Sequence, residues 1–289
     1  MHKMPKAKNV IEGKGITDSS KKLYLANLKR LNGGVDPTNY KFLEDTDAIE
    51  KRIEKYSTNT KRTYYISIVS YLPEKNKLRK YYYDKMQEIN KATRDNTEKS
   101  EKQKENWMTQ EQILETYEKL KNEADPLIKK KNMDNDTVMK YVALSLYVLQ
   151  PPRRSLDYTK LYVVPMYSDT QDKAYNYLSL KDRTFYFNNY KTKGAYQTQA
   201  VKVSDALFKL LKSYRKEGRL LSSKTGKEMS NSQMTHLLNS IFGKKIGVSM
   251  LRSIYLTSKY GEEQAQMKQD AHDLGTSLTT ITTNYVKQD

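Results

Sequence analysis

The most informative absences in this 289-residue chain are those of cysteine and histidine. The sequence contains no cysteine, which excludes disulfide bonds, thiolate metal sites and cysteine nucleophiles. Its three histidines are His2, His236 and His272, which are too few for a histidine-rich metal centre. We therefore expect no metal and no other cofactor.

Long apolar segments are also missing. No run of about 18 apolar residues occurs, so we expect no membrane span. The first residues contain no apolar stretch of the kind that forms the centre of a secretory signal. Together with the lack of cysteine, these absences fit a protein of a reducing, intracellular compartment.

Positive charge is what the chain has in excess. Lysine and arginine number 52 against 34 aspartate and glutamate residues, which gives a formal net charge of +18. Such a charge favours polyanions, because each neutralised phosphate releases condensed counterions. The 24 tyrosines point the same way, since tyrosine can stack on bases or bond phosphates. Nucleic acid is the expected partner, and a merely soluble basic protein is the alternative.

The first third of the chain predicts a small helical domain. Residues 1–16 are basic and are expected to form a flexible arm. Within residues 17–92, apolar spacing and capping residues predict four helices. Residues 93–106 have no apolar anchor and predict a linker, with a solvated helix end as the alternative. The predicted helices begin at Thr17, cover 45–56, follow Ser57 and cover 77–92.

Residues 107–289 predict a second domain with a different pattern. Helices are expected over 137–149 and 231–242, the latter ending at Gly243, and two or three more helices should reach the C-terminus. Between Tyr175 and Val203, alternating β-formers and turn residues predict a small antiparallel sheet. The expected fold class is therefore mainly α with a small antiparallel β-sheet, in two domains.

Four short motifs occur one after another in this second region. Pro151-Pro152 breaks a helix, and Arg154 then precedes Asp157 by three residues and Leu161 by seven. Asn189 to Lys193, with its Lys191-Thr192 pair, lies in the predicted hairpin. The other two motifs are Ser249-Met250-Leu251-Arg252 and Leu274-Gly275-Thr276-Ser277, the latter followed by Tyr285.

In type, order and spacing these motifs resemble the active-site boxes of tyrosine recombinases. Among that family, the chain looks most similar to integrases of large DNA viruses and their mobile elements. The resemblance implies an N-terminal helical core-binding domain and a catalytic domain that clamp double-stranded DNA. It also implies a homo-oligomer on DNA, a tetramer, located wherever the target DNA lies: the host nucleus, or a viral factory if the protein is viral.

The resemblance further implies site-specific cutting and rejoining of DNA strands through a covalent 3′-phosphotyrosine, without metal or ATP. Tyr285 would be the nucleophile, and Arg154 and Arg252 would clamp the scissile phosphate with paired donors. Lys191 would protonate the leaving 5′-oxygen, with Lys193 as the alternative. The simpler alternatives are a surface ion pair for Arg252 and a place in the core for Tyr285.

Some positions depart from the family pattern. Ser249 and Thr276 stand where the family has histidines, and a hydroxyl cannot relay protons near neutral pH. His272, one helical turn before Thr276, is an alternative proton carrier. Asp157 is expected to orient Arg154, and a plain ion pair between these two is the simpler alternative.

Two other functions stay open on the sequence alone. A type IB topoisomerase or a telomere resolvase uses the same arginine, lysine and tyrosine chemistry. The replaced histidines instead favour a catalytically inactive DNA-binding protein. Only Val286 to Asp289 follow Tyr285, where the family usually has a further helix that packs on a neighbouring subunit, so we expect either a weaker assembly or a shortened chain.

Overall fold

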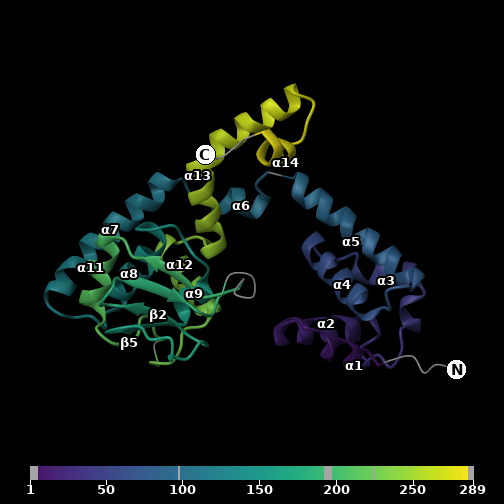
Figure 1. The fold of residues 1–289 in the computed structure, drawn as a ribbon, viewed down its shortest axis with the longest axis horizontal. Helices are drawn as coiled ribbons and strands as arrows, with labels where there is room; N and C mark the ends of the chain where they lie inside the picture. The colour runs from purple at the N-terminus through teal and green to yellow at the C-terminus, as the bar shows by residue number, and fades with distance from the viewer. Residues whose placement is uncertain (1–5, 97, 192–196, 224, 286–289) are drawn as a thin grey trace. The chain divides into compact units, whose positions relative to one another are not determined.

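The computed structural model describes residues 6–96, 98–191, 197–223 and 225–285, and it divides the chain into two compact units (Figure 1). Unit 1 comprises residues 1–98 and unit 2 residues 99–289. The boundary falls inside residues 93–106, for which a linker was predicted. Much of that stretch is helical, because α5 (Lys77–Asp95) extends into it and α6 (Glu101–Asn106) begins there.

Unit 1 is helical, and its helices begin where the sequence offers capping residues. The hydroxyl of Thr17 accepts a hydrogen bond from the amide of Ser20, and the hydroxyl of Ser57 accepts one from the amide of Thr60. The four predicted helices are present. The elements are α1 (Ala7–Glu12), α2 (Asp18–Leu31), the 3₁₀ turn η1 (Lys41–Leu43), α3 (Thr46–Ile53), α4 (Thr58–Tyr71) and α5.

The prediction of a flexible arm over residues 1–16 is wrong for its second half. Residues 7–12 form α1, and Ala7 and Ile11, four residues apart, are buried in the core of unit 1. The amide of Ala7 also donates to the carbonyl of Pro37 at 3.0 Å. Burial of one apolar face therefore holds a short helix that its composition alone did not predict.

Unit 2 combines helices with one sheet. The capping box of Thr109 and Gln112 opens α7, and Gly243 ends α12 with a positive φ of 62°, the latter as predicted. The elements of unit 2 are α6, α7 (Gln110–Lys129), α8 (Asp136–Val148), α9 (Ser155–Thr159), β1 (Leu161–Val164), β2 (Asn176–Ser179), β3 (Thr184–Phe187), β4 (Gln199–Lys202), α11 (Asp205–Tyr214), β5 (Gly218–Arg219), α12 (Asn231–Phe242), α13 (Val248–Asp273), α14 (Leu278–Thr280) and the helical turn η2 (Ile281–Tyr285).

The sheet is mixed, and the prediction of an antiparallel sheet is wrong. Its strand order is β4-β3-β2-β1-β5; β2, β3 and β4 pair antiparallel, but β1 pairs parallel to β2. A parallel pair needs a crossover, which residues 165–175 supply. The alternation between 175 and 203 identified three strands correctly. It could not reveal β1, whose four residues directly follow α9.

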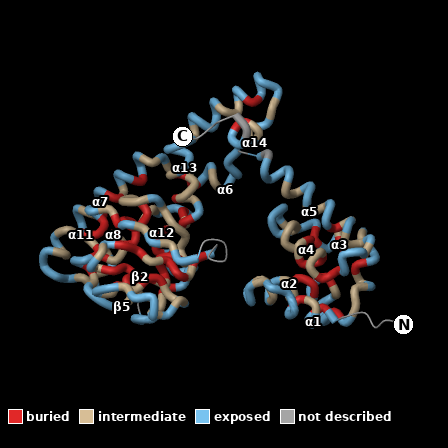
Figure 2. The backbone as a smooth tube through the Cα atoms, viewed as in Figure 1, coloured by how far each residue is buried: buried red, intermediate tan, exposed pale blue. Residues whose placement is uncertain are grey.

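The core of unit 2 lies between the sheet and its helices, with α8 almost entirely buried (Figure 2). Eleven tyrosines are buried among the residues that the structure describes. Tyr82 donates its hydroxyl to the carbonyl of Leu43, and Tyr158 donates to that of Leu146. Much of the tyrosine content is thus explained by packing with internal hydrogen bonds rather than by contact with bases.

The C-terminal part of unit 2 contains α13, α14 and the helical turn η2 after α12, in agreement with the prediction of two or three further helices. Residues 248–273 form one continuous helix, α13. Nearly all side chains from Leu256 to Asp270 are exposed, and Figure 2 shows this distal part of the helix in pale blue. Residues 256–285, which comprise distal α13, α14 and η2, are called the C-terminal arm below.

Candidate active site

Two arginines from distant parts of the sequence line one cavity of about 370 Å³ in unit 2. Arg154 is the N-cap residue of α9, with an extended backbone, two residues after Pro152. Arg252 lies in the second turn of α13, where its neighbours Leu251 and Ile254 are buried in the core. Packing of these two apolar residues leaves Arg252 on the side of the helix that lines the cavity.

Positive charge predominates in the cavity. Its lining includes Arg153, Arg154 and Arg252 against the carboxylate of Asp157, together with Lys202, whose ammonium group donates to the carbonyl of Asp182. Burial lowers the pKa of Arg252, and the nearby charge of Arg154 lowers it further. An anion in the cavity would relieve this repulsion, so the arrangement favours a group such as a phosphate.

Asp157 pairs with Arg153, and the prediction that it orients Arg154 is not what the contacts show. The Oδ2 atom of Asp157 accepts a hydrogen bond from Nε of Arg153 at 2.7 Å, and no contact described in the structure joins its side chain to Arg154. Arg154 is the N-cap residue of α9, and the amide of Asp157 donates to its carbonyl at 3.0 Å, so the two residues are joined through the backbone while the carboxylate bonds Arg153.

Two buried acceptors of the cavity have no protein partner among the described residues. They are Oδ1 of Asp157 and Oε1 of Gln150. Burial raises the pKa of Asp157, and the charge of Arg153 opposes that rise. Buried polar atoms are normally hydrogen-bonded, and an unsatisfied one costs about 1–3 kcal/mol. Two such acceptors beside three guanidinium groups indicate a polar binding cavity rather than a packing defect.

Arg153 is a functional candidate that the sequence analysis missed. Besides Asp157, its Nη2 atom donates to Oε1 of Gln199 on β4 at 2.9 Å, and its guanidinium carbon lies 3.8 Å from the ring centroid of Phe187 on β3. The two adjacent arginines, Arg153 and Arg154, were visible in the sequence. Which of them turns toward the sheet depends on tertiary contacts.

The β3–β4 connection carries the lysine candidates. Lys191 is exposed and directly follows Tyr190, which lines the cavity and donates its hydroxyl to the carbonyl of Gln197 at 2.6 Å. The amide of Asn189 donates to the side chain of Asn176, which anchors this end of the strand. Lys193 lies outside the described residues. The structure therefore places the backbone of Lys191 next to a cavity-lining residue.

Ser249 lies on the first turn of α13, three residues before Arg252, and is exposed. Residues three apart on a helix are neighbours, so the Ser249 hydroxyl lies on the Arg252 side of α13. Thr276 lies beyond the other end of the helix. There the amides of Gly275 and Thr276 donate to the carbonyls of His272 and Ala271, a Schellman-type ending.

The structure does not bring the arm residues to the arginine cavity. From Arg252 to Leu274 the chain advances 22 residues (274 − 252), about 33 Å along a helix at roughly 1.5 Å per residue. His272 is exposed and contacts Asp273, and Thr276 follows it. Tyr285 ends the turn η2 of the arm, and its side chain lies outside the described part.

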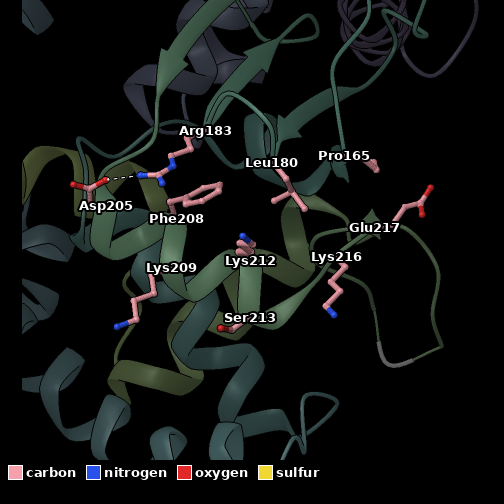
Figure 3. A pocket seen from close by; sticks show the side chains of 10 residues that line it. All are labelled: Pro165, Leu180, Arg183, Asp205, Phe208, Lys209, Lys212, Ser213, Lys216 and Glu217. Carbon is pink, nitrogen blue, oxygen red and sulfur yellow. Dashed lines mark hydrogen bonds and ion pairs between the residues drawn. The ribbon is translucent and has the colours of Figure 1, made fainter.

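A larger groove, of about 970 Å³, lies between α11 and the β2–β3 turn (Figure 3). Lys212 points into it between Leu180 and Phe208, while Arg183 is paired with Asp205 at 3.4 Å. Its lining contains none of the unpartnered buried polar atoms identified in the described residues. The smaller arginine cavity is therefore the better candidate for chemistry.

No group of three or more potential metal ligands from histidine, cysteine, aspartate and glutamate occurs among the described residues. No helix in the described ranges is long and apolar enough to span a membrane.

Comparison of the chain with protein-family models, with curated proteins and with solved structures gives no match.

Proposed function

We propose that the chain is a DNA strand-transfer enzyme of the tyrosine recombinase type. The observation that carries the proposal is the convergence of Arg154 and Arg252 on one cavity around the buried Asp157. The spacing of the sequence motifs independently points to the same two arginines. Their paired donors suit the two non-bridging oxygens of a phosphodiester, and they keep their charge at any physiological pH.

In the proposed reaction, the phenolate oxygen of Tyr285 attacks the scissile phosphorus. The bond from phosphorus to the 5′-oxygen breaks, and Lys191 gives that oxygen a proton to leave a free 5′-hydroxyl. The new 3′-phosphotyrosine bond conserves the energy of the phosphodiester, so a 5′-hydroxyl can reverse the step on the same or another strand. Arg154 and Arg252 stabilise the charge that develops on the phosphate during both steps.

The proposal requires movement of the C-terminal arm. A tyrosine that attacks a phosphate in the arginine cavity must come within bonding distance of it, whereas α13 continues as a helix to Asp273 and carries the following residues away from Arg252. Gly261 lies in the middle of this exposed stretch, and glycine weakens a helix by about 1 kcal/mol relative to alanine. We propose that α13 opens at Gly261 when DNA is bound.

The family resemblance extends the proposal to integration or excision of a mobile or viral DNA by a tetramer on two sites. A topoisomerase or resolvase with the same chemistry would relax or resolve DNA without pairing two sites. This difference distinguishes either enzyme from a recombinase. A non-catalytic DNA-binding protein is a second candidate. It is favoured by the exposed arm and by Ser249 and Thr276 at the histidine positions.

A covalent-capture experiment tests the proposal without knowledge of the target site. The full chain is incubated with a pool of nicked duplexes that carry a random central sequence, and complexes stable to detergent are isolated and sequenced. We expect a protein–DNA adduct, formed without metal or ATP, on a restricted set of sequences. Binding to the pool with no stable adduct would instead identify a DNA-binding protein without strand-cleaving activity.

A further inference from the structure

Arg153 joins three segments of unit 2 through one guanidinium group. Its Nε atom bonds the carboxylate of Asp157 on α9 at 2.7 Å, and its Nη2 atom bonds the side chain of Gln199 on β4 at 2.9 Å. The same group lies 3.8 Å from the ring centroid of Phe187 on β3 and 5.7 Å from that of Tyr190. These contacts tie α9 to both strands that carry the β3–β4 connection.

The geometry of this link depends on the shape of arginine. Two donors of one planar group point at two acceptors on different elements, while the face of the plane covers an aromatic ring. Lysine has a single charged nitrogen and cannot make both bonds in a fixed plane. The Arg153 side chain is 21% exposed and the Asp157 side chain 4% exposed, so the pair is shielded from the screening that weakens surface ion pairs.

Arg153 therefore differs in role from its neighbour. Arg154 and Arg252 have no hydrogen bond or ion pair described in the structure, which leaves their donors for a ligand. Two donors of Arg153 are already engaged with protein atoms. Arg153 is the side chain that joins the segment carrying Arg154 to β4, whereas Asn176 joins the carbonyl of Asp157 to that of Asn189.

We propose that Arg153 is a positioning residue that holds Phe187 to Tyr190, and with them Lys191, beside the arginine cavity. This inference rests on the proposed strand-cleavage function. It predicts that Arg153 acts on proton donation to the leaving 5′-oxygen rather than on phosphate binding. Loss of the link displaces the lysine but leaves the guanidinium groups of Arg154 and Arg252 in place, because the described side-chain bonds of Arg153 go to Asp157 and Gln199.

The test compares two leaving groups in Arg153→Lys, which keeps the charge and loses the second bond. A 5′-sulfur leaving group needs no proton donor, so it separates positioning of Lys191 from all other defects. On the ordinary 5′-oxygen substrate, we expect adduct formation to slow by up to about 10²-fold, the cost of a misplacement of about 1 Å. On the 5′-sulfur substrate, the variant should cleave within a few-fold of the parent.

A matched control is Arg183→Lys. Arg183 also contacts an aromatic ring, Phe208, and an aspartate, Asp205, but at the groove of α11. It should cleave both substrates at the parental rate. An equal loss on both substrates in Arg153→Lys, or no loss on either, would overturn the positioning role.

Hydrogen exchange gives a readout that does not need catalysis. In Arg153→Lys, amides of residues 187–190 and 197–199 should exchange faster than in the parent, whereas those of β1 and β2 should not change. If the parent forms no adduct with either substrate, the proposed function fails, and this exchange pattern still decides whether Arg153 holds the connection. Unchanged exchange in those residues would overturn the inference by itself.

Discussion

The arginine cavity and the C-terminal arm carry the two halves of the proposed active site, and they differ in how they are held. Around the cavity, Arg153 and Asp157 are bonded and the flanking residues are buried. In the arm, Leu256, Tyr260 and Leu274 are 49%, 45% and 70% exposed. A solvated helix of this length is only marginally stable in isolation. Under the proposed function, the bonded cavity would bind the phosphate, and the exposed arm would have to move to bring Tyr285 to it.

Removal of a cavity arginine should have the largest effect. Arg154→Ala or Arg252→Ala is expected to slow adduct formation by about 10²–10³-fold, since one preorganised donor to a developing oxyanion contributes roughly 3–4 kcal/mol. DNA binding should change little, because many other cations contact the backbone. Timed quenching on a suicide duplex measures the rate, and electrophoretic mobility measures binding. A variant that cleaves within a few-fold of the parent would remove that arginine from the site.

The next largest effect is expected at the exposed lysine beside the cavity. Lys191→Ala should slow cleavage of the 5′-oxygen substrate by about 10²-fold, at the low end for a general acid, and a 5′-sulfur leaving group should restore the rate. The same substrate should not rescue Arg154→Ala, because charge on the phosphate still needs neutralising. Rescue of Lys193→Ala, in place of Lys191→Ala, would move the role two residues along.

A smaller effect is expected from stiffening the arm. A Cβ atom at position 261 would meet the Thr257 methyl group at 3.5 Å, an ordinary contact, so Gly261→Ala fits the continuous helix. Alanine favours helix by about 1 kcal/mol, and adduct formation should therefore slow about five-fold if α13 must open. Ser258→Ala, on the same exposed stretch, is the control. An unchanged rate in Gly261→Ala would show that Tyr285 is delivered by an arm whose helix stays continuous, as from a second copy of the chain.

Local features of the fold could be predicted from the sequence, and features set by tertiary contacts could not. The caps at Ser57 and Thr109 and the left-handed Gly243 depend on neighbouring residues, and all three are present. Whether residues 161–164 form the parallel strand β1 depends on the strand with which they pair, and the local sequence does not specify that strand. Helix α1 depends on a core to cover Ala7 and Ile11.

The same distinction holds within the candidate site. Motif spacing named Arg154 and Arg252, and the fold brings them to one cavity. Spacing also assigned Asp157 to Arg154, but the carboxylate bonds Arg153, whereas Arg154 is joined to Asp157 through the backbone. No local rule relates Arg153 to Gln199, 46 residues away in the sequence. The position of the arm likewise depends on tertiary contacts rather than on its local sequence.

The most direct test of the account is to identify the residue that becomes linked to DNA. Tyr285→Phe should bind DNA normally and form no adduct, and proteolysis of the parental adduct should give a nucleotide-bearing peptide that contains Tyr285. Tyr190→Phe is the control, because Tyr190 lines the arginine cavity and its hydroxyl is bonded to Gln197. It should still form the adduct. An adduct that persists in Tyr285→Phe, or that maps to Tyr190, would contradict the assignment of the arm as the source of the nucleophile.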